Sequence, residues 1–335
     1  MIEPTISWFH KVTGHPGSKK LRLTLQQRYY HPELRHHIDK YKCADCQKHK
    51  LSGKGYGLLP EQEVRSEPFE EVAVDLIGPW KVTVRGKHYK FNALTSIDTV
   101  TNLVEIVRIE RKTSHHIKQK FAQSWMARYP WPKHCVHDNG GEFTGWEFQE
   151  FLAKTGVQDV PTTSRNPTAN SVCERMHQTV GNVLRTTLHG NPPKNLTKAN
   201  ELIDEALSTA MHSMRSSVHT TLGSSPGSLV FNRDMYLNIL LVADWHAITT
   251  KREHVINTNL MRENKKRRRF DYQINKKVLK KVHDPTKLGI RTQGPYNIKQ
   301  VHTNGTLTME LRPGITERIN IRRVIPFHEE TTDPA

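Results

Sequence analysis

Apolar positions along this chain change their period several times, and these changes divide it into regions. Between 18 and 42 they recur every three or four residues and predict two short helices. From 67 to 160 short β-branched runs alternate with helical patterns, and further helical patterns follow to 282. After 286 the chain returns to short alternating runs, and Asn304-Gly305 is a strong hairpin signal between two of them.

The predicted elements fall into three groups. Strands are expected at 72–76, 89–97, 103–109, 135–138 and 157–160, helices at 114–129, 146–155, 169–188, 201–215 and 244–282, and closing strands at 294–301, 306–311 and 317–325. The middle group has the order of an open mixed sheet with helices on it, where sites gather at strand ends. The fold class is therefore a multidomain α/β protein with a small helical module first and a small β-barrel last. The predicted boundaries are 1–50 for the helical module, 51–66 for a linker, 67–225 for the core, 226–285 for a helical basic linker, 286–328 for the barrel and 329–335 for a tail.

Charge indicates the class of partner. The 335 residues carry a formal net charge of +17, which points first to nucleic acid and second to an anionic membrane. No apolar run approaches the roughly 18 residues that a membrane span needs. Residues 1–15 lack the apolar segment of a secretory signal, so we expect a reducing compartment.

Two histidines and two cysteines in the first 50 residues suit tetrahedral zinc: His10, His15, Cys43 and Cys46. A helical module this small needs such a metal to stabilise it. Other ligands are available nearby, since His31, His36 and His37 could compete. The C-x-x-C pair could instead be a redox pair, although no βαβ pattern surrounds it.

Three acids form the second candidate site. Asp75 lies in an apolar strand, Asp138 ends another strand before Asn139-Gly140, and Glu174 lies on a helix, with 35 residues between it and Asp138. Three such carboxylates would bind hard divalent cations, and a pair of these cations facing a phosphodiester is the arrangement of two-metal phosphoryl transfer. The competing acids are Asp98, Glu142 and Glu147, which we expect to be turn, surface or capping residues.

Basic residues concentrate near the C-terminus. Residues 262–281 hold ten lysines and arginines against two acids, with five consecutive cations at Lys265, Lys266, Arg267, Arg268 and Arg269. This run is either a phosphate-contacting surface or a nuclear import signal. Arg322 and Arg323 give the predicted barrel a basic surface.

These residues together resemble the integrases of long-terminal-repeat retrotransposons, closest to the gypsy-type group. His10, Gly14-His15-Pro16-Gly17 and Cys43 to Lys48 resemble the family's zinc-binding HHCC module. Asp75, Asp138-Asn139-Gly140-Gly141-Glu142-Phe143 and Asn166-Pro167 through Glu174-Arg175 resemble its DDE triad on an RNase H-like core, and 286–327 resembles its SH3-like barrel.

The resemblance implies an enzyme that trims the 3′ ends of retroelement DNA and joins them to target DNA. It implies two Mg²⁺ (or Mn²⁺) ions at Asp75, Asp138 and Glu174, and one structural Zn²⁺. Asn170, His177 and Gln178 share the helix face of Glu174 and would contact double-stranded DNA beside the metals. The family also implies a homo-multimer, a tetramer or larger, that acts in the nucleus after synthesis in the cytoplasm as part of a polyprotein.

Two other functions remain open on the sequence alone. One is a non-catalytic DNA- or chromatin-binding protein derived from such an element, against which the intact acid triad counts. The other is a related nuclease or DNA transposase, against which the zinc module and the barrel count. The sequence does not determine target-site preference, subunit number, the host tethering partner, the native polyprotein boundaries or whether this copy is active.

Overall fold

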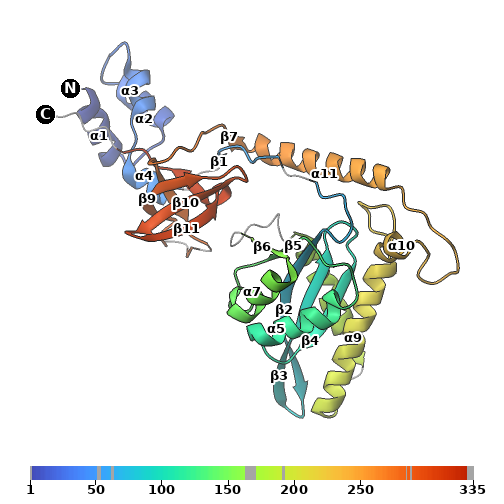
Figure 1. Cartoon of the computed structure of the whole chain (residues 1–335). Helices are drawn as coiled ribbons and strands as arrows, with labels where there is room; N and C mark the ends of the chain where they lie inside the picture. The colour runs from blue at the N-terminus through green and yellow to red at the C-terminus, as the bar shows by residue number, and fades with distance from the viewer. Residues whose placement is uncertain are drawn as a thin grey trace. The chain divides into compact units, whose positions relative to one another are not determined.

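The computed structural model describes residues 2–50, 54–61, 64–162, 171–190, 193–283, 285–286 and 289–329, with only the backbone described for 171–175, 189 and 190. These residues form two compact units (Figure 1). Unit 1 comprises Met1–Pro60 and Leu260–Ala335, and unit 2 comprises Glu61–Asn259. We describe each unit by itself.

Unit 1 begins with four short helices: α1 (Ile2–Val12), α2 (Ser18–Gln26), α3 (Leu34–Lys40) and α4 (Ala44–His49). The second and third correspond to the two helices predicted between 18 and 42. The apolar faces of α1, α2 and α3 meet in one small cluster of buried side chains: Ile6, Phe9, Leu21, Leu25, Leu34 and Ile38. A core of this size stabilises a fold only weakly, which is why a metal is expected to support it.

The second part of unit 1 is a five-stranded antiparallel sheet with the order β11-β10-β9-β8-β12. Its elements are β8 (Lys277–Lys281), β9 (Thr292–Val301), β10 (Thr306–Arg312), β11 (Ile315–Asn320), the 3-10 turn η2 (Ile321–Arg323) and β12 (Val324–Pro326). The predicted Asn304-Gly305 turn joins β9 to β10, and Gly305 has a φ of 73°, a conformation that glycine adopts without strain.

One long helix was predicted wrongly. The polar pattern over 244–282 predicts a single helix, but α11 (Trp245–Lys265) ends at Lys265, and β8 begins the barrel sheet before residue 286. Between them β7 (Arg267–Arg268) pairs in parallel with β1 (Gly55–Tyr56). Arg267 explains this break in the helix, because its side chain donates to the backbone carbonyls of Gly57, Tyr56 and Ile321.

Unit 2 contains the open mixed sheet that the sequence predicts, with the order β4-β3-β2-β5-β6. Its strands are β2 (Glu71–Val84), β3 (Lys87–Asp98), β4 (Val104–Ile109), β5 (His134–His137) and β6 (Gln158–Pro161). β3 is antiparallel to both of its neighbours, β2 and β4, and β5 and β6 run parallel to β2.

Helices cover both faces of this sheet (Figure 1). One face packs against α5 (Ser114–Phe121), the π-helical turn η1 (Ala122–Met126), α6 (Gly141–Thr144) and α7 (Trp146–Thr155). The other packs against α8 (Ser171–Gly190) and α9 (Leu196–Ser216), and α10 (Pro226–Phe231) follows. The predicted multidomain α/β fold class is confirmed. Within the described residues, no helix is both long enough and apolar enough to cross a membrane.

Candidate metal centres

His10 and His15 are brought together by the end of the first helix. His10 is buried in the last turn of α1. After the helix, Gly14 and His15 both adopt left-handed backbone conformations, with φ of 76° and 56°, which reverse the chain. The N–H of His15 then donates to the carbonyl of His10 at 2.7 Å. The four-residue interval therefore returns the second imidazole to the side of the first.

Cys43 and Cys46 come from the start of α4. Cys43 is its N-cap residue, and its carbonyl accepts the N–H of Gln47 at 3.1 Å. One helical turn therefore places the two thiols on the same side. Burial, followed by the neighbouring Cys43, raises the pKa of the Cys46 thiol, while Lys50 lowers it.

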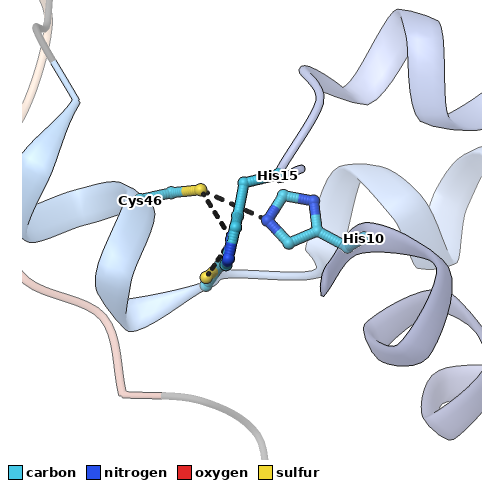
Figure 2. Close-up of side chains that lie close together, drawn as sticks. His10, His15 and Cys46 are labelled. Atoms are coloured by element: carbon cyan, nitrogen blue, oxygen red, sulfur yellow. Dashed lines mark hydrogen bonds between the residues drawn. The ribbon is translucent and has the colours of Figure 1, made fainter. Parts of the chain in front are cut away.

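The four ligand atoms of these residues all lie within 4.8 Å of one another. Nε2 of His10 is 3.2 Å from Sγ of Cys46, and Nδ1 of His15 is 3.5 Å from Sγ of Cys43 and 3.6 Å from Sγ of Cys46 (Figure 2). In a tetrahedral zinc site, bond lengths of about 2.3 Å to sulfur and 2.0 Å to nitrogen separate the two ligands by about 3.6 Å. The donor set and its spacing both fit zinc.

The competing histidines lie outside this group. His31, His36 and His37 have their rings near one another, with centroid separations of 5.5 and 6.1 Å. The ring of His37 faces the carboxylates of Glu3 and Glu33, at 3.7 and 3.8 Å. Acidic neighbours, and not the cysteines, therefore surround these side chains.

Asp75 lies on β2, and Asp138 directly follows the adjacent parallel strand β5. The register pairs Glu71 with His134 and Ala73 with Val136. Extended by two residues, one past the end of β5, this register would set Asp75 opposite Asp138. Neighbouring strands are about 4.8 Å apart, so the two carboxylates share one edge of the sheet.

Backbone donors orient both carboxylates. The N–H of Leu76 donates to Oδ1 of Asp75 at 2.8 Å, and the N–H of Gly140 donates to Oδ1 of Asp138 at 3.0 Å. The side chain of Asp75 is mostly buried, whereas Asp138 is exposed at the start of the loop. One oxygen of each carboxylate is thus fixed by the local backbone.

Helix α8 carries Glu174 against the same part of the sheet. Its residues Met176, Val180 and Leu184 are buried in the cluster that includes Ala73 and Ile77 of β2. The backbone of Glu174 lies within this helix, and its carboxylate lies outside the described residues, as does Asn170.

His177 is one turn beyond Glu174 and faces Asp75. Its Nε2 lies 3.6 Å from Oδ2 of Asp75 and is buried. Burial lowers the pKa of His177, which favours the neutral imidazole. Gln178, the next predicted DNA-contacting residue, is exposed on the same helix.

His137 is a residue of this site that sequence reasoning missed. Its buried ring lies 2.5 Å from the carbonyl oxygen of Asp138 through Nδ1 and 2.5 Å from Oδ1 of Asp159 through Nε2. The ring also stacks on Phe143 at a centroid distance of 5.1 Å. The only local signal was its position beside Asp138, because Asp159 comes from the neighbouring strand β6.

The competing acids have structural roles. Asp98 is fully buried, and its carboxylate accepts hydrogen bonds from the N–H of Phe69 at 3.0 Å and from the hydroxyl of Thr101 at 2.6 Å. It therefore fixes the turn between β3 and β4. Glu142 and Glu147 lie in the first turns of α6 and α7, where a negative charge suits the helix dipole.

The predicted DNA-contacting cations divide by exposure. Lys265, Lys266, Arg268 and Arg269 are exposed, whereas Arg322 and Arg323 are half-buried. The guanidinium of Arg268 lies over the ring of Tyr56, 5.3 Å from its centroid. Arg267 is bound to three backbone carbonyls, and a DNA-contacting role for it finds no support.

Known proteins resemble this chain in both sequence and fold. Residues 1–52 match the family model of the integrase zinc binding domain. The Retrovirus-related Pol polyprotein from transposon 412 of Drosophila melanogaster is 22% identical over 340 residues, which cover 94% of this chain and 27% of that polyprotein. The Transposon Tf2-3 polyprotein of Schizosaccharomyces pombe is 24% identical over 221 residues, or 64% of this chain and 16% of that polyprotein. The chain thus spans about a quarter or less of these relatives.

A solved structure has the same fold. A chain of the simian T-cell lymphotropic virus intasome, solved in complex with PP2A regulatory subunit B56 gamma, aligns with a TM-score of 0.64 and 16% identity. The alignment covers 96% of this chain and 98% of that one. The fold and the zinc group are similar to those of integrases. The transposon relatives make the assignment more particular: they support a retroelement integrase, as the sequence motifs predicted.

Proposed function

We propose that this chain is an integrase that trims the 3′ ends of retroelement DNA and joins them to target DNA. The observation that supports the proposal is the parallel pairing of β2 with β5, since Asp75 lies on β2 and Asp138 directly follows β5, with the helix of Glu174 packed on β2. Such a set of oxygen ligands suits Mg²⁺ or Mn²⁺. Two bound ions would activate the attacking oxygen and stabilise the leaving oxygen of an in-line displacement.

The side chains of the chain have positioning roles in this reaction. Asp75, Asp138 and Glu174 would hold the ions. The backbone N–H groups of Leu76 and Gly140 orient two of these carboxylates before any substrate binds. The neutral imidazole that burial favours at His177 adds no positive charge beside Asp75. In phosphoryl transfer such positioning supplies most of the catalytic effect.

The remaining parts of the proposal concern zinc, DNA and assembly. His10, His15, Cys43 and Cys46 would hold one structural zinc ion. The net charge of +17 supports binding to double-stranded DNA as the substrate. Integration requires two DNA ends to meet one target, so we also propose a homo-multimer acting on nuclear DNA.

A strand-transfer assay tests the reaction. Duplexes with recessed 3′ ends are incubated with the full chain in Mg²⁺ or Mn²⁺, and joined products are counted. Asp138→Asn and Glu174→Gln should each reduce joining by at least about 100-fold, the scale of losing one charge-stabilising group. The matched control is Glu147→Gln, which removes an acid of the first turn of α7 and should leave joining unchanged.

A second readout shows whether the acids bind the metal. Mg²⁺ should raise the Tm of the parent protein, because a ligand that binds the folded state stabilises it. This rise should be lost in Asp138→Asn and kept in Glu147→Gln. DNA binding without joining in either metal, by zinc-loaded and folded protein, would instead favour a binding-only descendant. Joining that survives both substitutions would show that other acids catalyse it.

A further inference from the structure

The β2–β3 hairpin extends well past the candidate catalytic centre. Strand β5 pairs with β2 only over Glu71 to Ala73, whereas β2 itself continues to Val84. Beyond that point β2 pairs with β3 alone in the described sheet, up to the turn at Arg85-Gly86. The hairpin formed by residues 78–92, here called the distal hairpin, projects past α5 and α7 in Figure 1.

The distal hairpin carries only positive charge. It contains the cations Lys81, Arg85, Lys87 and Lys90, together with His88, and has no aspartate or glutamate. All five of these side chains are exposed, and none of them makes an ion pair with a described residue. Several cations elsewhere in unit 2 do have acidic partners: Arg108 pairs with Asp204, Lys154 with Glu150 and Lys198 with Glu201.

Two of these cations oppose each other across the hairpin. The register pairs Lys81 directly with Lys90, so their side chains project from the same face. Like charges in this position destabilise a hairpin. A bound polyanion would remove that repulsion, because phosphates would lie between or beside the two ammonium groups.

The distal hairpin also borders α8, the helix that carries Glu174. A groove of about 360 Å³ lies between it and α8, lined by Trp80, Lys81, Gly181, Arg185 and Leu188 among others. Gly181 and Arg185 follow Glu174 by seven and eleven residues, so all three share one face of the helix. Arg185 is exposed and adds a fifth cation to this surface.

We propose that the distal hairpin and Arg185 form a phosphate-contacting surface for the DNA duplex that leaves the catalytic centre. This inference rests on the proposed function and adds to it a surface that binds the DNA duplex. Lys81 lies six positions beyond Asp75 along β2, a distance of about 20 Å at roughly 3.3 Å per residue. A duplex following β2 would thus meet the hairpin about six nucleotides from the reacting phosphate, at 3.4 Å per nucleotide of each strand.

Lysines on an edge strand have a second possible use, which is to prevent edge-to-edge aggregation. The substitution Lys81→Glu separates the two roles. It keeps a charge on the edge strand and converts the Lys81–Lys90 repulsion into an attraction, so the Tm should stay the same or rise. Contact with phosphate should nevertheless be lost at this position.

The experiment measures binding of the full chain to a labelled 30-base-pair duplex by fluorescence anisotropy, as a function of salt. The affinity falls as salt rises, and each lost phosphate contact should reduce the steepness of log K against log salt by about 0.9. The triple variant Lys81→Gln, Lys87→Gln, Lys90→Gln should therefore lower it by about 2 to 3. The matched control Arg111→Gln, Lys112→Gln, Lys154→Gln removes the same charge from elsewhere in unit 2 and should leave the slope unchanged.

Two duplexes distinguish the source of the DNA. One has a recessed 3′ end, and the other is capped by closed loops at both ends and offers only internal duplex. If the salt dependence becomes less steep only with the first duplex, the surface binds the element's end. If it becomes less steep only with the second duplex, the surface binds target DNA. A slope that stays at the parental value in both the triple variant and Lys81→Glu, on both duplexes, would overturn the proposal.

The outcome also separates this surface from the proposed enzyme. If the parent joins no ends in either metal but the triple variant still loses slope, the surface stands and the enzymatic function falls. If the parent joins ends and the triple variant keeps its slope, the enzymatic function stands and the surface falls.

Discussion

Cys46 lies close to both histidines of the zinc group, with its sulfur 3.2 Å from His10 Nε2 and 3.6 Å from His15 Nδ1. We predict that Cys46→Ser weakens zinc binding by at least about 100-fold. Losing a residue that only supports a metal ligand costs up to about 100-fold, and losing a ligand itself should cost at least as much. Zinc content after dialysis against a weak chelator should fall from one per chain to none. His36→Ala, which alters an exposed histidine of the same module, should keep its zinc. Zinc retained by Cys46→Ser would exclude this thiol as a ligand.

Single residues also show how far the sequence alone can predict the site. His10, His15, Cys43 and Cys46 could be proposed because their intervals match tetrahedral zinc and each pair is local. The contact between His137 and Asp159 could not, because it depends on the register of β5 against β6, which no local pattern encodes. The parallel pairing of β2, which carries Asp75, with β5, which Asp138 follows, likewise has no local signal in the sequence.

At the scale of elements, a buried carboxylate ties β4 to helices on both faces of the sheet. Glu105 of β4 accepts hydrogen bonds from the hydroxyl of Tyr129 at 2.6 Å and from Arg215 of α9 at 2.5 Å. Burial and then Glu105 raise the pKa of Tyr129 to about 12. The folded state therefore holds this proton more tightly than the unfolded chain does, whose tyrosines titrate near 10.

The stability from this bond should be complete below about pH 10 and should decline as the pH rises toward 12. We predict that Tyr129→Phe lowers the free energy of unfolding at pH 7 by about 1.5 to 3 kcal/mol, typical of a hydrogen bond to a charged group. It should also flatten the loss of stability above pH 10. Urea unfolding from pH 7 to 11.5 measures both effects, with the exposed Tyr236→Phe as control. Parallel pH profiles for parent and Tyr129→Phe would contradict this account.

Elements were predictable where their stabilising contacts are local. The helix at 146–155 matches α7 because its apolar period and the closing Gly156, with φ of 71°, lie within a few residues. The helix predicted to 282 failed because lysine and arginine favour helices locally. Instead, distant carbonyls of Gly57, Tyr56 and Ile321 bind Arg267. The length of β2 was likewise underestimated, since its distal half depends on pairing with β3.

At the scale of the whole molecule, the zinc module is joined to the barrel within unit 1. The side-chain amide of Gln47 pairs with both backbone groups of His328, at 2.9 Å each, and Thr292 donates to the carbonyl of Lys48 at 2.8 Å. All three contacts involve α4, the helix whose first turn presents Cys43 and Cys46. A change at the metal should therefore reach the barrel through this helix.

We predict that removing zinc with a chelator affects unit 1 unequally and leaves unit 2 intact. Residues 2–50 have a small core and should lose amide protection from hydrogen exchange. The barrel keeps its own core of Val278, Ile298, Leu307 and Met309, so only 292–293 and 327–328 should exchange faster there. The sheet of unit 2 belongs to a separate unit and should exchange as before. Gln47→Ala with zinc bound should reproduce the faster exchange at 327–328 alone. Equal loss of protection across both units on chelation would instead show that the chain unfolds as one cooperative body, with zinc stabilising all of it.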